Sequence, residues 1–463
     1  MNSGYVLAGF ETLGAIIDRF MKNENSDTSF FKREDIANVF NSSCNKFLHS
    51  YGQNFKGKKN HDKHSAAEAN VLKECRSFGF FDKSIFVVDS GGFQISIGML
   101  NGQEAQILQK IYYEFLVDYY DVYDRAFILD IPPGPGCNVF KSFDDVYRMN
   151  FESYNTARNL PDKVREKVIY IHHFRTPKLW DIYTDLLNHE EMFNAFKYHA
   201  TGGIVANAGS DTAIPCIIYV LPLISLLNQA IKFKRTELHY HILGGATYRD
   251  VLFYELFKKV VKEEHNIDLH ITYDSSGIFK GLMIGRTIPI IDGDVITKID
   301  LRTECLNEIF TKDRGLTSEG TNAEVYIKRL NKFARENNLK EITRTEIYNL
   351  ETGTFFNEFR IYSMLYMISI YKDIEESFRK KADELYPIYK SGDLELFNHE
   401  INIITRNING GKMSRKQKSK STSISRSLDM LRNLDENYCH YIVNKSLSKD
   451  EFVDLTNDKL IKF

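Results

Sequence analysis

Seven short apolar runs rich in β-forming residues recur along the chain, and each ends in Gly, Pro or a polar cluster. They span residues 4–11, 84–92, 125–136, 167–174, 198–206, 237–245 and 268–277. Helical patterns fill the gaps, as in 247–263, where apolar residues recur at intervals of three and four. Strands that alternate with helices are typical of parallel βα units. With an eighth strand expected within 13–80 or just after 280, the sequence predicts an α/β fold, a (β/α)8 TIM-like barrel. A doubly wound open sheet is the alternative.

The length of 463 residues exceeds one average domain, but a large barrel with additions accounts for most of it. We expect residues 1–390 to form the barrel with insertions. Residues 356–385 show the pattern of a long amphipathic helix. Residues 391–463 are expected to form a helical C-terminal extension. It carries a basic, polar loop at 409–426, which is either a solvated linker or an arm that contacts phosphates.

Composition excludes several classes of protein. A formal net charge of −2 gives no global electrostatic case for nucleic-acid binding, so any such binding needs a local basic surface. The six cysteines occur singly, which argues against a disulfide framework and suits a reducing cytoplasm. The apolar stretch 213–227 contains Pro215 and Pro222 and is shorter than the roughly 20 residues of a membrane span. We therefore expect a buried helix there, no signal peptide and no membrane association.

Polar residues gather where the predicted strands end, and a barrel places those ends at one rim, where active sites of this fold lie. They are Asp89, Asp130, His172, His173, Gly202, Gly203, His241 and Asp274. Three aspartates therefore converge at the predicted mouth. In the stretch 87–98, Asp89 is followed by Ser90 and two glycines. Glycine lacks a Cβ, so the pair could let a flat ligand approach the main chain closely. The alternative is an ordinary turn that ends a strand.

The motifs resemble those of the tRNA-guanine transglycosylase family, whose members exchange a guanine base for a 7-deazaguanine on a (β/α)8 barrel. DSGGFQ (89–94) is similar to the signature hexapeptide of the family. Five weaker matches follow in the order of the family: ILDIPPG (128–134), IYIHHF (169–174), HATGGIVA (199–206), HYHILGGA (239–246) and ITYDSSG (271–277). The helical pattern at 357–374 resembles the closing helix of the family, so the resemblance covers roughly 85–390.

The resemblance implies a role for each matched residue. Asp274 matches the nucleophile that attacks C1′ of the nucleoside, and Asp89 fits the group that moves a proton to and from the bases. Asp130 matches the base-recognition aspartate. The main chain of Gly203 and the imidazole of His172 or His173 could donate to O6 of the base, and Phe93 or a tyrosine could stack on it. The remaining residues of the expected substrate site are Ser90, Gly91, Gly92, Gln94, Gly202 and Gly244.

The sequence also departs from the family. Members that act on tRNA carry a Cys-x-Cys-x2-Cys cluster and a His for structural zinc. Here only Cys305 lies in that region, with Phe356 or Asn357 at the position of the His, so four zinc ligands cannot be assembled. We expect no metal and no other cofactor. This pattern resembles the divergent branch of phages and bacterial modification clusters that inserts 7-deazaguanines into DNA.

We therefore expect a pentosyltransferase that replaces guanine in DNA with a free 7-deazaguanine base, through a covalent glycosyl-enzyme. It would work in the cytoplasm, that of the host if a phage encodes it. DNA phosphates would be contacted by Lys280, Arg286, Lys416, Lys418 and Lys420. A homodimer or a partner subunit is compatible with this pattern.

Three alternatives stay open at this point. The substrate could be tRNA, and the chain could be a non-catalytic subunit of such an enzyme. His239 and His241 also suggest a metal-dependent barrel hydrolase, although in that class the His-x-His pair lies on the first strand. Strand alternation places both histidines on one face, where they could simply fill a layer of the barrel.

Overall fold

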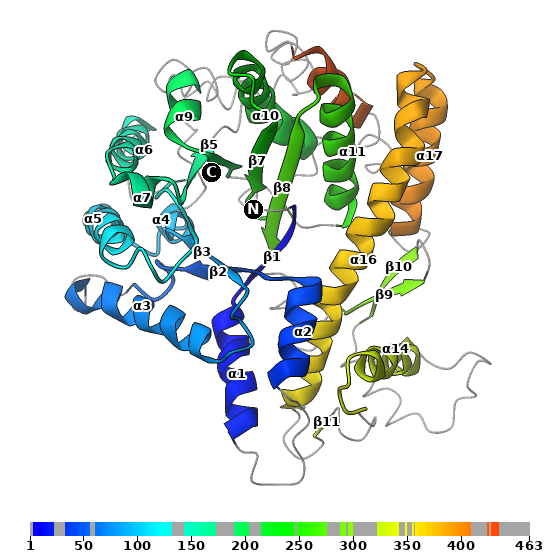
Figure 1. The fold of residues 1–463 in the computed structure, drawn as a ribbon, viewed down its shortest axis with the longest axis horizontal. Coiled ribbons are helices and arrows are strands. Elements are labelled where there is room, and N and C mark those ends of the chain that lie inside the picture. Colours follow the sequence, from blue (N-terminus) through cyan, green and yellow to red (C-terminus); the bar gives the residue numbers. More distant parts are fainter. Residues whose placement is uncertain are drawn as a thin grey trace.

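The structure is a computed structural model, drawn in Figure 1. It describes residues 3–22, 33–55, 61–131, 143–172, 189–202, 214–245, 248–275, 288–292, 295–299, 322–341, 348–349, 354–355, 357–408, 424–425 and 427–434.

Eight parallel strands close into a barrel in chain order, which confirms the predicted (β/α)8 fold and overturns the open-sheet alternative. The strands are β1 (Gly4–Ala8), β2 (Lys46–Ser50), β3 (Ile85–Asp89), β4 (Arg125–Phe127), β5 (Val168–His172), β6 (Tyr198–Thr201), β7 (Glu237–Ile242) and β8 (Asp268–Ser275). The barrel closes where β1 pairs with β8, with Val6 opposite Asp274. The seven predicted runs all contain a strand, and the eighth strand is β2, within 13–80.

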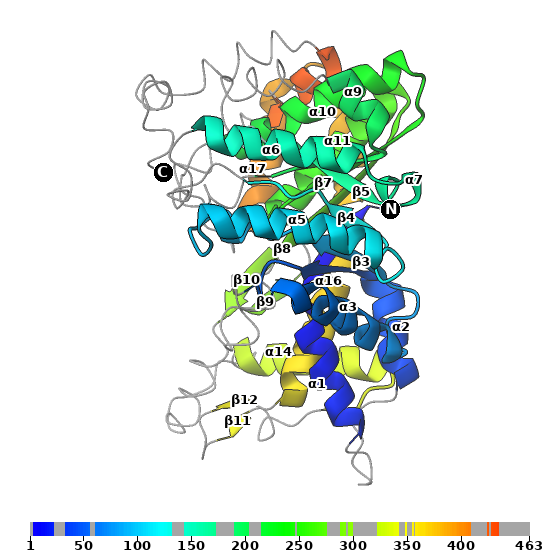
Figure 2. The same cartoon turned by 90° about the vertical axis from the view of Figure 1, so that its left-hand side faces the viewer.

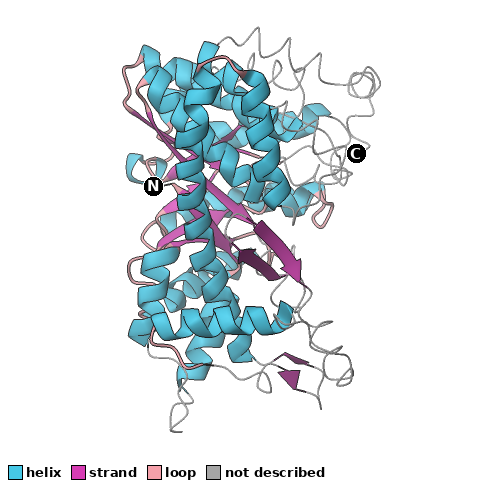
Figure 3. Cartoon of the chain, turned by 90° about the vertical axis from the view of Figure 1, so that its right-hand side faces the viewer, coloured by secondary structure: helices cyan, strands magenta, loops and turns pink. Residues whose placement is uncertain are grey.

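Helices cover the outside of the strands (Figure 3). They are α1 (Phe10–Lys22), α2 (Arg33–Ser43), α3 (His61–Ser77), α4 (Gly92–Ser96), α5 (Gly102–Asp118), α6 (Phe143–Arg158), α7 (Asp162–Arg165), α9 (His189–Ala195), α10 (Ile214–Lys232) and α11 (Tyr248–His265). The helix expected at 213–227 is α10, with Pro222 inside it. Within the described residues, every helix falls short of the length and apolar character needed to cross a membrane.

The helix ring is completed by α16 (Asn357–Lys390), which lies between α11 and α2 (Figure 1). Its Glu375 reaches the seam between the first and last strands. The backbone N–H of Tyr5 donates to Glu375 Oε1 at 3.0 Å, and the hydroxyl of Tyr273 donates to the same oxygen. A residue of the predicted long helix thus fastens β1 to β8.

The chain between β8 and α16 includes β9 (Ile288–Asp292), β10 (Val295–Ile299), α14 (Asn322–Glu336), β11 (Tyr348–Asn349) and β12 (Thr354–Phe355). After α16 comes α17 (Leu394–Ile408), which packs against α16 and α11. The domain boundary expected at residue 390 falls between these two helices and stays a prediction. Of the predicted basic loop, 409–423 and 426 lie outside the described residues.

An aromatic cluster fills the space between the barrel and its first helices. The rings of Phe10, Phe47, Phe81 and Phe86 are fully buried, and Phe47 lies 4.7 Å from Phe81 and 5.1 Å from Phe10, centroid to centroid. Burial of a phenylalanine stabilises a fold by roughly 1.5–3 kcal/mol, so this cluster anchors α1 and β2 to β3.

Candidate active site at the carboxyl ends of the strands

Three aspartates lie at the carboxyl ends of the barrel strands, as expected. Asp89 is the last residue of β3, Asp274 is the last residue but one of β8, and Asp130 is the third residue after β4. The pKa of Asp89 is raised from 3.8 to about 7. Burial is the largest cause, and the negative charges of Asp130 and Asp274 add to it. The structure therefore brings the three carboxylates within electrostatic reach of one another. Asp130 and Asp274 are buried, whereas Asp89 is half-buried at the rim.

Asp89 is held by the neighbouring strand β2. The hydroxyl of Ser50 donates to Asp89 Oδ2 at 3.0 Å, and the N–H of Tyr51 donates to the Asp89 carbonyl at 2.9 Å. The Ser50 bond and one from the Gly91 N–H both favour the ionised form, but they only partly offset the effect of burial on the pKa. Asp89 can therefore exchange a proton near neutral pH, as a general acid or base requires.

Asp274 has a different environment. Its Oδ1 accepts a hydrogen bond from the Gly244 N–H at 2.9 Å and lies 3.2 Å from His241 Nε2. His241 Nδ1 in turn contacts Thr272 Oγ1 at 2.9 Å, so a Nε2–H tautomer would donate to Asp274 and accept from Thr272. These two donors fix the orientation of the carboxylate. The sequence motifs indicated Asp274 and Gly244 as site residues, but not His241 as their partner.

The two glycines after Ser90 allow their backbone to lie close to the backbone of other segments. A Cβ on Gly91, whose φ is +93°, would lie 2.5 Å from the Cα of Gly52. A Cβ on Gly92 would lie 1.5 Å from the carbonyl oxygen of Asp130. Ser90 is fully buried, and its Oγ accepts a hydrogen bond from the Gly92 N–H at 3.3 Å. The space left by the missing side chains, expected to admit a flat ligand, is therefore occupied by protein backbone.

Phe93 and Gln94, the last two residues of the hexapeptide, are more exposed than Ser90, Gly91 and Gly92. Phe93, in α4, is 44% exposed and is free to contact a ligand at the rim. The buried side-chain carbonyl oxygen of Gln94 has no hydrogen-bond partner among the described residues. Both observations are compatible with the expected substrate contacts.

His172 contacts Tyr170 and His199, whose rings pack against helices α6 and α9. Its ring is 4.9 Å from that of Tyr170, which contacts Tyr154 of α6, and its Nε2 is 3.2 Å from His199 Nδ1. His199 stacks on Phe193 of α9. Alternate residues of a strand share a face, so His172 and Tyr170 face the helix layer. These contacts favour a structural role for His172 over a role in base recognition.

Several expected site residues fall outside the residues that the structure describes. They are His173, Gly203, Lys280, Arg286, Lys416, Lys418 and Lys420. Gly202 is described, and its N–H donates to the His172 carbonyl at 3.3 Å.

The histidines of the HYH motif have separate partners. His241 contacts Asp274, whereas the ring of His239 stacks on His270 of β8 at 4.7 Å. In the described part of the chain, no group of three His, Cys, Asp or Glu side chains is arranged to hold a metal ion. Both histidines contact side chains of β8, in agreement with the expectation that they share one face and fill barrel layers.

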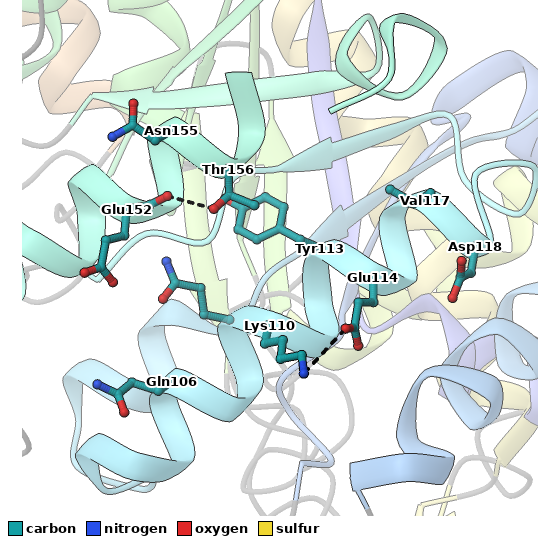
Figure 4. Close-up of a pocket in the computed structure, with 10 residues that line it drawn as sticks. Gln106, Lys110, Tyr113, Glu114, Val117, Asp118, Glu152, Asn155 and Thr156 are labelled. Atoms are coloured by element: carbon teal, nitrogen blue, oxygen red, sulfur yellow. Dashed lines mark hydrogen bonds and ion pairs between the residues drawn. The ribbon is translucent and has the colours of Figure 1, made fainter. Parts of the chain in front are cut away.

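A separate groove lies on the outside of the barrel, between α5 and α6 (Figure 4). Its volume is about 770 Å³, and Lys110, Tyr113, Glu114 and Glu152 are among its lining residues. Figure 2 shows the two helices side by side outside the strands. The groove therefore belongs to the helix layer and does not contain the three aspartates.

A scan against models of protein families gives no match for this chain, and a search of curated proteins gives no relative. The case for a function therefore rests on the barrel rim and on the sequence motifs that lie there.

Proposed function

We propose that the protein is a base-exchange transglycosylase that replaces guanine in DNA with a 7-deazaguanine. The observation that carries this proposal is the pairing of two carboxylates in different environments at one rim. Asp89 has a pKa of about 7, and Asp274 is oriented by His241 and the Gly244 N–H. Two carboxylates with separate tasks are what retention at a glycosidic carbon requires.

The first step breaks the bond between C1′ and N9 of guanine. An oxygen of Asp274 attacks C1′ and forms a glycosyl ester, and the bonding electrons leave with guanine, which takes a proton from Asp89. In the second step the incoming 7-deazaguanine gives its N9 proton to Asp89 and N9 attacks C1′. The ester bond to Asp274 then breaks. Both side chains return to their starting protonation states, so the exchange needs no other reactant.

Base recognition is assigned to Asp130 and Phe93. A carboxylate accepts hydrogen bonds from N1–H and the 2-amino group of guanine, and adenine does not offer this pair of donors. The exposed ring of Phe93 supplies a surface for stacking. A guanine within a duplex must leave the stack to reach buried carboxylates, so the proposal includes extrusion of the nucleotide.

The choice of DNA over tRNA rests on the resemblance to the DNA-modifying branch and on the lack of the Cys-x-Cys-x2-Cys pattern in the sequence. The phosphates would be held by basic residues, with Lys280 and Arg286 as the first candidates from the sequence.

Nucleoside mass spectrometry of DNA and tRNA tests the proposal. Cells that are supplied with 7-deazaguanine precursors would express the wild type or, as a matched control, Asp274→Asn. We expect a deazaguanine nucleoside in the DNA digest of the wild type only. Its appearance in tRNA alone would establish the tRNA alternative, and its absence from both would contradict base exchange.

A further inference from the structure

The segment that carries Asp130 continues beyond the β-ladder and is bound by side chains of two helices. β4 ends at Phe127, whose carbonyl accepts a hydrogen bond from the hydroxyl of Tyr112 at 2.5 Å. The N–H of Leu129 donates to the hydroxyl of Tyr113 at 3.2 Å, and the hydroxyl of Ser153 donates to the Leu129 carbonyl. The N–H of Ile128 still donates to the Ile169 carbonyl of β5, and beyond it side chains of α5 and α6 take the place of a strand partner.

Asn150 of α6 binds the main chain of Ile131, the residue after Asp130. Its Oδ1 accepts from the N–H of Ile131 at 2.8 Å, and its Nδ2 donates to the Ile131 carbonyl at 3.1 Å. The side chain is buried, so these two bonds satisfy main-chain groups that water cannot reach easily. An amide bound at both ends permits little rotation of the backbone that it holds.

The opposite side of Asp130 is constrained by Gly92. The carbonyl oxygen of Asp130 lies so close to Gly92 that a Cβ there would be 1.5 Å away. The main chain at 130–131 is thus confined between α6 and the turn after β3. A displacement at Ile131 must therefore move the Asp130 side chain within the mouth.

We infer that Asn150 is a positioning residue for Asp130, which acts by fixing the carboxylate for guanine recognition. This inference rests on the proposed function, because it assigns Asp130 to the 2-amino group and N1–H of the base. Selectivity between guanine and hypoxanthine, which lacks the 2-amino group, is the property that depends on this position.

The test measures dissociation constants of the purified full-length protein for guanine and hypoxanthine by titration calorimetry. For Asn150→Ala we expect the preference for guanine to fall about tenfold, since a displaced carboxylate loses its bond to the 2-amino group. In the Asp130→Asn background the same substitution should leave the preference unchanged, because the two residues act as one unit.

Gln109→Leu is the matched control. Gln109 Nε2 donates to the Met149 carbonyl at 3.1 Å, so this variant loses a buried bond between the same two helices without touching 127–131. It should keep the wild-type preference. Asn150→Asp, which retains the acceptor for the Ile131 N–H, gives the same comparison if Asn150→Ala does not fold.

A purely structural Asn150 would weaken binding of both bases equally and leave the preference intact, and that result would overturn the inference. A fall of equal size in the Asp130→Asn background would overturn it as well. If the wild type binds neither base, the proposed function fails first, and this outcome is distinct from the other two.

Discussion

The hydroxyl of Ser50 donates to Asp89 Oδ2 at 3.0 Å and joins the ends of two adjacent barrel strands. Burial and the charges of Asp130 and Asp274 raise the pKa of Asp89, whereas the Ser50 bond lowers it, and the balance lies at about 7. The protonation state of the proposed acid thus depends on one hydroxyl of the neighbouring strand.

Ser50→Ala should shift the pH dependence of exchange. Removing the bond raises the pKa of Asp89 further, so the protonated acid persists to higher pH. In the wild type we expect kcat/KM for DNA to fall as pH rises past about 7, and in the variant that limb should move to higher pH. The measurement is a pH–rate profile from pH 5 to 10. Ser96→Ala is the control, because Ser96 bonds to the Phe93 carbonyl and not to Asp89. A limb that stays in place or moves to lower pH would contradict the assignment of Asp89.

Asp274→Asn should lower the exchange rate at least about a thousandfold with little loss of stability. The amide oxygen can still accept from the Gly244 N–H, but a neutral amide cannot form the glycosyl ester. Without incoming base, the wild type should form a covalent complex with DNA that survives denaturing electrophoresis, and the variant should form none. Mass spectrometry of the variant excludes deamidation back to Asp. Turnover within a few-fold of wild type would remove Asp274 from the mechanism.

Gly92→Ala tests the close approach at the rim. The new Cβ would meet the Asp130 carbonyl oxygen at 1.5 Å, so the main chain must move. We expect a loss of about 3 kcal/mol or more in the free energy of unfolding, together with loss of guanine binding. Gly102→Ala, at the first position of α5, should be near neutral, because helical backbone accepts alanine. A stable Gly92→Ala protein that binds guanine normally would contradict the described approach of the two segments.

Strands β3 and β2 differ in how well the local sequence predicts them. An apolar run that ends in Gly–Gly predicts β3, and this signal is contained within a few residues. No such run marks β2, because its sequence KFLHS has polar residues whose partners are distant in the chain. Lys46 donates to the Ser3 carbonyl, and His49 pairs with Glu11 and Glu68. Burial of such side chains is favourable only once those partners are in place, and no local pattern reports that.

In the candidate site, too, some features follow from the sequence and others depend on tertiary contacts. The positions of Asp89 and Asp274 follow from strand ends, which the sequence marks. The contacts of Gly91 with Gly52, and of Gly92 with Asp130, join segments some 40 residues apart. The direction of His172 depends on the register of β5, because adjacent residues face opposite sides of a strand. The local sequence pattern therefore predicts which residues lie at the rim of the barrel. Tertiary packing determines which of their side chains point into the mouth.

His49 makes stability depend on pH. Burial alone would lower its pKa, but hydrogen bonds and charges from Glu11 and Glu68 outweigh this and raise the pKa to about 9. A raised histidine pKa stabilises the fold fully below the unfolded value of about 6.5, and this stabilisation is lost as pH rises through about 9. We expect His49→Gln to cost roughly 3 kcal/mol at pH 6 and clearly less at pH 10. Denaturant unfolding at both pH values measures this. His399→Gln, at an exposed position of α17, should show no such difference, and a cost for His49→Gln that is constant with pH would contradict the ion-pair assignment.

The basic loop is tested by the salt dependence of DNA binding. In the proposed exchange the mouth holds an extruded nucleotide while its flanking phosphates cross the rim, and contacts from a few lysines and arginines would suffice despite the net charge of −2. Each phosphate contact adds about 0.9 to the log–log salt slope on duplex DNA and about 0.7 on single strands. Replacing Lys416, Lys418 and Lys420 with Ala should weaken binding equally for all sequences and flatten that slope.

Exchange at saturating DNA should change little in this triple variant, because phosphate contacts position the backbone without reading the base. Lys110, Lys332 and Lys380 lie exposed on three different helices, so their replacement by Ala gives the same change in net charge as a control. The control should keep the wild-type slope. Equal slopes for all three proteins would identify residues 409–426 as a solvated linker, and a salt-dependent exchange on tRNA but not on DNA would overturn the choice of substrate.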